Sequence, residues 1–211
     1  MKEDGRTERA SRSREQKRAH ILSTAIRVFG KKGFHQTSIA DIVDEAGVAR
    51  GTFYLYFESK SAVFLELLDQ LLLHLRQNVV GVDVGAGARP IDEQLLDTVR
   101  RILRTAENNR SLATILFREA VGLDADVDRK LREFYGSIHL FLVGSFSEGE
   151  RLGLTRPLDT EATASCILGS IKQVIEQHLV VDADAVFDID RFASAIVSYN
   201  IRGLMPHTPS N

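Results

Sequence analysis

The 211-residue chain is poor in several residue types, and each shortage argues against a class of protein. Its single cysteine, Cys166, cannot form an internal disulfide, which fits a reducing compartment. The absence of tryptophan and the presence of only four prolines suit a helical chain. Apolar runs extend over only a few residues, so we expect no membrane-spanning segment. The first eighteen residues are polar and lack the apolar stretch of a secretory signal.

Motifs for catalysis and for metal binding are missing as well. The six histidines and the lone cysteine have no metal-ligand spacing. Neither a nucleophile elbow nor a catalytic-acid pattern occurs. Gly85 and Gly87 form a Gly-x-Gly pair in the loop 81–90, but no strand precedes it, so a nucleotide-binding loop is rejected. We therefore expect no metal, no cofactor and no catalytic residue, and an enzyme is the weakest of three interpretations.

Helical periodicity is what the chain does contain. Apolar residues recur at helical spacing and no alternating strand pattern is found, which predicts an all-α fold of about nine helices. The expected helices are approximately 14–32, 38–46, 49–57, 60–80, 91–107, 110–121, 124–147, 160–181 and 190–204. Hydrophobic residues make up 44% of the chain and charged residues 27%, an ordinary composition for a globular protein.

The stretch 37–60, TSIADIVDEAGVARGTFYLYFESK, is the most informative. Its first part places Ile39, Ile42, Val43 and Ala46 at the i, i+3, i+4, i+7 positions of one helical face, and Thr37 or Ser38 can cap that helix. Gly47 suits a tight turn that requires a positive φ. A second short helix follows that is rich in Arg, Thr and Tyr. Two short helices joined by a glycine turn predict a helix-turn-helix, whose second helix enters the major groove of DNA.

The segment IADIVDEAGVARGTFYLYFESK resembles the DNA-binding signature of the TetR/AcrR family of bacterial transcriptional regulators. The resemblance covers approximately residues 18–68, and the remainder is similar to the family in length and helical layout. It implies phosphate contacts for Tyr54, Tyr56 and Lys60 and an N-terminal cap at Thr37. It also implies a ligand pocket among the helices of the C-terminal part.

Residue chemistry adds candidate base contacts to these phosphate contacts. The guanidinium of Arg50 can bind guanine O6 and N7, Gly51 permits a close backbone approach, and Thr52 can meet a phosphate or a thymine methyl. Leu55 departs from the polar or aromatic residues often found at its position in the family. The alternative for the tyrosines is burial. The candidate DNA-binding residues are Thr37, Ser38, Arg50, Gly51, Thr52, Tyr54, Tyr56 and Lys60.

Charge is distributed unevenly along the chain. Residues 1–60 contain 12 Lys and Arg against 8 Asp and Glu, whereas the remaining residues are net negative. A positive N-terminal part fits a polyanionic partner such as DNA. The basic residues within 1–17 can serve as an arm that contacts DNA or can form a solvated tail, and both alternatives stay open.

Two further sets of residues are expected in the C-terminal part. Large apolar side chains on its helices are candidates for the walls of a pocket for a hydrophobic or acyl-type effector, or equally for plain core. These candidates are Phe64, Leu68, Leu103, Phe117, Phe134 and Phe141. Small residues on one helix face allow close helix packing, so we expect a homodimer interface there. Its candidate residues are Ala162, Ser165, Cys166, Gly169, Phe192, Ile196 and Val197.

The resulting domain organisation has four parts. We expect a flexible basic arm at 1–17, a helix-turn-helix DNA-binding domain at 18–60, a helical ligand-binding and dimerisation domain at 61–204, and a disordered tail at 205–211. The expected function is that of a cytoplasmic, nucleoid-associated bacterial repressor. It would bind a palindromic double-stranded DNA operator as a homodimer, with no membrane partner, and be released by a small hydrophobic effector. The alternative is a TetR-like accessory or nucleoid protein without an effector.

Overall fold

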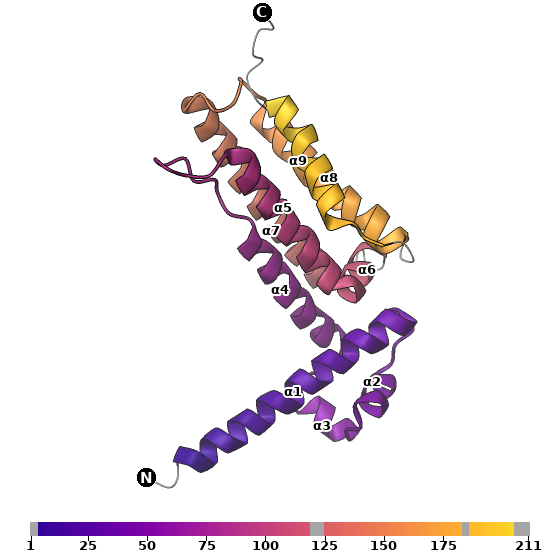
Figure 1. Cartoon of the computed structure of the whole chain (residues 1–211). Helices are drawn as coiled ribbons and strands as arrows, with labels where there is room; N and C mark the ends of the chain where they lie inside the picture. Colours follow the sequence, from indigo (N-terminus) through magenta and orange to yellow (C-terminus); the bar gives the residue numbers. More distant parts are fainter. Residues whose placement is uncertain (1–3, 119–124, 183–185, 205–211) are drawn as a thin grey trace, which may run out of the picture. The chain divides into compact units, whose positions relative to one another are not determined.

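A computed structural model describes residues 4–118, 125–182 and 186–204 (Figure 1). Every element in these ranges is helical, which confirms the all-α prediction. The elements are α1 (Asp4–Lys32), α2 (Ile39–Ala46), α3 (Arg50–Tyr54), α4 (Lys60–Asn78), α5 (Ile91–Asn108), α6 (Arg110–Arg118), α7 (Ala125–Arg151), α8 (Thr160–Ile175), the π-helix η1 (Glu176–Val181) and α9 (Ile189–Leu204). The expected tail 205–211 lies outside the described residues.

The basic segment at the N-terminus differs from its prediction. Residues 4–17 continue α1 instead of forming a flexible arm, so the helix begins about ten residues earlier than expected. The segment is built of good helix formers such as Arg, Glu, Gln and Ala. Ser11 also bonds Glu15 one helical turn later, with 3.4 Å between the hydroxyl and carboxylate oxygens. Periodicity of apolar residues could not detect this turn because residues 11–17 are all exposed or polar.

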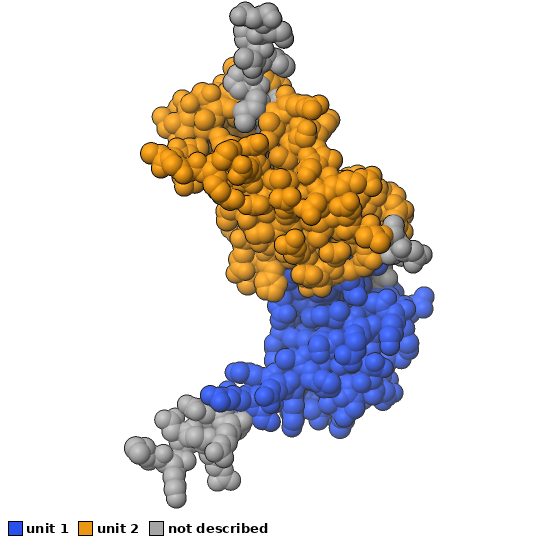
Figure 2. All heavy atoms as spheres, in the orientation of Figure 1, with its two compact units in different colours: residues 1–71, 111–127 blue, residues 72–110, 128–211 orange. Residues whose placement is uncertain are grey.

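The described chain divides into two compact units (Figure 2). Unit 1 comprises residues 1–71 and 111–127, and unit 2 comprises residues 72–110 and 128–211. The division falls inside α4, between Leu71 and Leu72, and also inside α6, between Arg110 and Ser111. The sequence-based boundary at residue 60 missed this arrangement, because a continuous helical pattern carries no sign of where contacts change partner.

Aromatic side chains form the core of unit 1. The ring centroid of Phe34 lies 5.3 Å from that of Phe29 and 5.2 Å from that of Phe64, and all three side chains are buried. Phe53, the fourth of the five residues of α3, is fully buried, with its ring centroid 5.8 Å from that of Phe57. A helix of five residues has no independent stability, so α3 depends on this burial.

Helices α5, α7, α8 and α9 supply most of unit 2. Leu103 of α5 and Ala193 of α9 are fully buried, and an ion pair joins the same two helices, with 2.7 Å between Arg100 Nε and Asp190 Oδ1. Asn200 of α9 donates to the Ser170 hydroxyl of α8 over 3.3 Å. The expected long helix 160–181 is instead an α-helix that changes to π geometry at Glu176. Leu179 and Val180 of this π turn are buried.

The described ranges lack two features. No helix within them is long and apolar enough to cross a lipid bilayer. The same residues contain no cluster of three or more His, Cys, Asp or Glu that is arranged to hold a metal ion.

Candidate functional site

Helix α2 begins with a reciprocal cap. The Ser38 hydroxyl accepts a hydrogen bond from the Asp41 amide (3.1 Å), and Asp41 Oδ2 accepts one from the Ser38 amide (2.8 Å). This capping box satisfies two backbone N–H groups that would otherwise have no partner at the helix end. Ser38 is therefore the N-cap, and the cap role implied for Thr37 is corrected. The reason is that Ser38 has the extended backbone a cap requires, with φ −99° and ψ 162°.

The carboxylate of Asp41 is held in its charged form. Its pKa lies far below the ordinary value, first because Lys32 donates a hydrogen bond to it and then because the Ser38 amide and hydroxyl do so. A lowered folded-state pKa means that this contact stabilises the folded protein above the unfolded-state pKa and is lost as the pH falls through the folded-state value. The start of α2 is thus insensitive to pH near neutrality.

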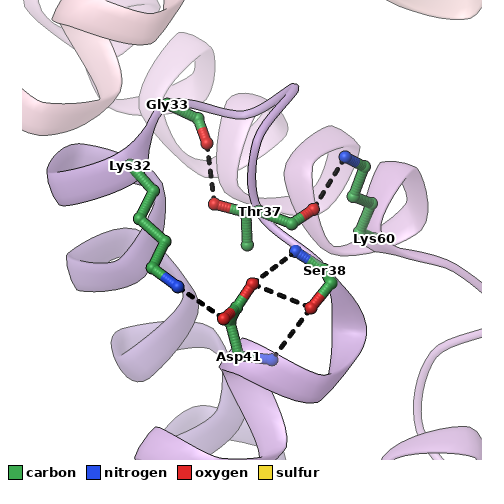
Figure 3. A network of polar contacts seen from close by, with 6 residues as sticks. All are labelled: Lys32, Gly33, Thr37, Ser38, Asp41 and Lys60. Carbon is green, nitrogen blue, oxygen red and sulfur yellow. Dashed lines mark hydrogen bonds and ion pairs between the residues drawn. The ribbon is translucent and has the colours of Figure 1, made fainter.

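Thr37 and Lys60 act on the backbone between α1 and α2 (Figure 3). Thr37 is buried, and its hydroxyl donates to the Gly33 carbonyl at 2.7 Å. The Lys60 ammonium donates to the carbonyls of Phe34 (2.8 Å), His35 (3.1 Å) and Thr37 (2.8 Å). A lysine ammonium has three N–H donors, so these acceptors use all of them in this conformation. The phosphate contact predicted for Lys60 stays a prediction, because it must compete with these carbonyls.

The turn and α3 present a polar face to solvent. Gly47 takes the left-handed conformation (φ 63°) that ends α2, as predicted. Phe53 is buried beneath α3, which leaves Arg50, Gly51 and Tyr54 exposed on the outer side. The Arg50 guanidinium lies 5.8 Å from the Tyr54 ring centroid, and a Cβ on Gly51 would meet no atom within 4 Å. Arg50 and Gly51, predicted to contact bases, and Tyr54, predicted to contact a phosphate, are therefore all accessible to solvent.

The ends of this face hold the remaining candidates. Thr52 and Tyr56 are half-buried, and Leu55 is 72% exposed, so an apolar side chain projects from the same region. Two arginines of α1 that the motif did not indicate lie over aromatic rings of this region, and Arg18 is also ion-paired with Glu66. Arg14 lies over the ring of Tyr56 at 6.0 Å and Arg18 over the ring of Phe57 at 5.0 Å. Their four-residue spacing, one helical turn, was the available sequence signal.

An apolar cavity of about 180 Å³ lies within unit 2. Of the predicted pocket walls, Phe141 lines this cavity and the other five residues do not, so a ligand contact for those five stays a prediction. Phe64, Leu68 and Leu103 are buried core, and Phe134 packs edge-on against Tyr135 with ring centroids 5.3 Å apart. Phe117 belongs to unit 1.

The residues predicted for a dimer interface separate into two groups. Ala162, Ser165, Cys166 and Gly169 all lie on the exposed face of α8. Ile196 and Val197 are buried within their own protomer and line the cavity, so their assignment to a dimer surface is corrected. Phe192 is half-buried and stacks on His178, with ring centroids 4.4 Å apart. Periodicity places residues on one face of a helix, but it does not distinguish a face that covers its own core from one that is left open.

The fold and the exposed face of α3 define a helix-turn-helix protein, and comparisons with known proteins agree. The family model for bacterial regulatory proteins of the tetR family matches residues 21–67. An uncharacterised HTH-type transcriptional regulator of Bacillus subtilis, YdgC, is 27% identical over 195 residues, which cover 90% of this chain and 93% of YdgC. The fatty acid metabolism regulator protein of the same organism is 23% identical over 87% of this chain and 93% of its own.

Solved structures show the same architecture. The fatty acid degradation regulator FadR of Bacillus halodurans superposes with a TM-score of 0.69 at 24% identity, over 89% of this chain and 95% of its own. FadR of Bacillus subtilis, solved in complex with stearoyl-CoA, gives 0.68 at 22% identity over 88% and 98%. Residues 21–67 therefore form a DNA-binding domain of the tetR type, and the chain is similar over most of its length to transcriptional regulators and has the fold of the solved ones.

The hydrogen bonds of Lys60 to the turn between α1 and α2 can be tested by substitution. Replacing Lys60 by Met keeps the length of the side chain but leaves three backbone carbonyls without their donor. We expect the free energy of unfolding to fall by about 2 kcal/mol, because hydrogen bonds from a charged donor are lost. Urea denaturation followed by circular dichroism measures this change.

The matched control is Lys31→Met, because Lys31 is an exposed lysine whose nearest described charge, on Glu45, is 3.9 Å away. Its unfolding free energy should stay within about 0.5 kcal/mol of the parent value. Equal stability of the two variants would show that Lys60 does not hold this turn.

Proposed function

We propose that the protein is a ligand-responsive repressor that binds a palindromic operator as a homodimer and is released by a small apolar effector. The observation that supports DNA recognition best is the surface of α3. Phe53 holds the helix by its buried side chain, and Arg50, Gly51 and Tyr54 of the same helix are accessible to solvent. A helix held in this way can enter a major groove without unfolding any of its own contacts.

The side chains on this surface suit two kinds of DNA contact. Arg50 has the fork of donors that matches guanine O6 and N7, and its stacking on Tyr54 limits the conformations it must give up on binding. The Tyr54 hydroxyl is exposed and is a donor suited to phosphate oxygens, whereas the Ser38 hydroxyl would have to exchange its hydrogen bond to Asp41 for one to a phosphate. Base contacts then determine the sequence that is bound, and phosphate contacts determine the register.

Arg50→Ala tests base recognition. A palindromic duplex is first selected from a random pool on the parent protein, and affinity is then compared for that duplex and a scrambled one. We expect the ratio of the two affinities to fall by the factor that corresponds to about 1–3 kcal/mol of binding free energy for each contacted base pair, because a bidentate contact to a base is lost. The slope of log affinity against log salt should stay the same, since no phosphate contact is removed.

Arg27→Ala is the control, because Arg27 is an exposed arginine on α1 and lies far from α3 in the sequence. Its affinity ratio should match that of the parent protein. If Arg50→Ala kept the parent ratio of affinities for the selected and scrambled duplexes, Arg50 would not be a base-contacting residue.

Dimerisation is proposed from the open face of α8. The small side chains of Ala162, Ser165, Cys166 and Gly169 would let a second helix approach closely, and all four are exposed in the single chain. The neighbouring α9 adds Tyr199, which is 76% exposed, and the exposed Ala195. A single helix-turn-helix contacts few base pairs, whereas two related by a dyad recognise a palindrome with useful specificity.

Gly169→Leu tests this face without disturbing the protomer. A Cβ at Gly169 would meet no atom within 4 Å, so the substitution strains nothing inside the single chain. In a close helix–helix interface it overpacks, and we expect the dissociation constant of the dimer to rise at least tenfold, corresponding to a loss of about 1.4 kcal/mol or more. Sedimentation velocity over a dilution series measures the constant.

Gly144→Leu is the matched control, since Gly144 is an exposed helical glycine of α7 that also has no atom within 4 Å of its Cβ position. It should dissociate as the parent protein does. The same dissociation constant for both variants would place the interface on another surface.

Effector control is proposed from the cavity in unit 2 and from two helices that belong to both units. Residues of α4 and of α6 occur in unit 1 and in unit 2, so a change in the packing of unit 2 can act on unit 1 through continuous helix. In unit 1, α6 packs closely on α1, since a Cβ on Gly30 would lie 2.9 Å from the Ser111 hydroxyl oxygen. The proposal is supported by FadR of Bacillus subtilis, which has the same fold and was solved in complex with stearoyl-CoA, a molecule with a long apolar acyl chain.

Linkage provides the test of effector control. The molecule that copurifies with the protein is identified by native mass spectrometry and titrated calorimetrically with and without the selected duplex. We expect its affinity to differ by about 5–150-fold between the two titrations, because an effector that releases DNA must bind the DNA-free state more tightly. Equal affinities would favour the alternative of an accessory or nucleoid protein without an effector.

A further inference from the structure

The cavity in unit 2 has a composition that restricts what can occupy it. Helices α5, α7, α8 and α9 and the segment that follows α4 all contribute to its wall. Representative lining residues are Val99, Ile171 and Val197, one from each of three helices. No charged side chain lines it among the described residues. An ionised ligand group would lose its hydration here without gaining a counter-charge, which is strongly unfavourable.

Three lining residues carry polar side chains, and two of them are already bonded. The Ser145 hydroxyl donates to the Phe141 carbonyl at 2.8 Å, and the Asn200 amide donates to the Ile196 carbonyl at 2.9 Å. The Thr155 hydroxyl oxygen is buried and has no hydrogen-bond partner within the described part of the chain. A buried hydroxyl without a partner is unfavourable, and a ligand that bonds to it recovers this loss.

The wall also includes residues that reach solvent. Val80, Val82 and Phe141 line the cavity and are each at least 36% exposed. An apolar molecule can therefore enter from solvent without opening the core. The same exposed side chains remain partly hydrated while the cavity is empty, so a ligand that covers them gains hydrophobic free energy.

We propose that this cavity binds an uncharged, compact apolar molecule that carries one hydroxyl or carbonyl oxygen, which bonds to the Thr155 hydroxyl. The volume sets the size of the ligand: an apolar cavity of about 150 Å³ holds benzene, so about 180 Å³ accommodates six to eight non-hydrogen atoms. A ring or a short alkyl chain fits this limit, whereas the eighteen-carbon chain of stearoyl-CoA exceeds it. The role of this ligand as an effector rests on the proposed function, but its binding does not.

A homologous series of primary alcohols measures the size limit. The full-length protein without DNA is titrated calorimetrically with 1-butanol to 1-dodecanol, and with sodium hexanoate as the charged counterpart of 1-hexanol. Affinity should increase about fourfold for each added methylene, as expected from apolar burial, and level off near seven carbons. Hexanoate should bind at least tenfold more weakly than 1-hexanol. Affinity that rises steadily to 1-dodecanol, or tighter binding of hexanoate, would overturn the proposal.

Thr155→Val separates the hydrogen bond from the volume, because valine has nearly the same shape as threonine and no hydroxyl. We expect binding of 1-hexanol to weaken about two- to tenfold and binding of benzene, which cannot accept a conventional hydrogen bond, to stay the same. The control is Thr163→Val on α8, which does not line the cavity and should change neither affinity. Equal loss of both ligands in Thr155→Val would overturn the role of the hydroxyl.

Two variants that fill the cavity locate the site. Ile171→Phe adds volume to its wall and should abolish binding of both 1-hexanol and benzene. Ser145→Leu does so from an exposed position of α7, so folding should be preserved even if the first substitution is not tolerated. Circular dichroism and thermal melting establish that each variant is folded. Parent-like affinity for both probes in folded Ser145→Leu would show that the alcohols bind elsewhere.

The selected operator duplex distinguishes this inference from the proposed function. If 1-hexanol binds with the expected size limit but leaves operator affinity unchanged, the cavity assignment stands and effector control through this ligand class fails. If operator affinity responds to the copurified molecule while no alcohol of the series binds, effector control stands and the cavity assignment is overturned.

Discussion

The contact between the rings of Phe34 and Phe64 is the packing interaction on which the helix-turn-helix depends. Their centroids are 5.2 Å apart, and Phe34 lies directly after α1 whereas Phe64 lies in the first turns of α4. The Lys60 ammonium extends over the same Phe34 ring at 4.6 Å while it bonds the carbonyls of the α1–α2 turn. Apolar packing and charged hydrogen bonds therefore hold the same junction, so α2 and α3 keep a defined position relative to the start of α4.

Much of this could be predicted from the sequence, because local rules determine it. The α2 helix, its cap at Ser38 or Thr37 and the glycine turn follow from spacing and backbone preference, and the choice between Ser38 and Thr37 was the only part left open. The exposed side of α3 follows from the burial of Phe53. The three carbonyls that accept from Lys60 were not predictable, since they lie 23 to 26 residues away and backbone acceptors leave no trace in residue identity.

The cavity illustrates a second limit of sequence reasoning. Hydrophobic periodicity predicts which side of a helix is buried. It does not predict a cavity, because a cavity forms where the buried side chains of different helices leave space between them. Ile196 and Val197 show this directly, because they have the apolar spacing of an interface and instead form part of an internal wall. The small residues of α8, by contrast, are exposed to solvent. Only the packing of four helices together decides between these outcomes.

The change from α to π geometry at the end of α8 has a consequence for comparing this chain with its relatives. A π turn accommodates one more residue than the α turn it replaces, so it is how a helix absorbs a single-residue insertion without displacing its flanks. In η1 the wider turn brings Val180 to the same side of the helix as Ile175, five residues earlier, and both side chains are buried. An alignment of this chain with a relative whose helix is α throughout should therefore place a one-residue gap within 176–181.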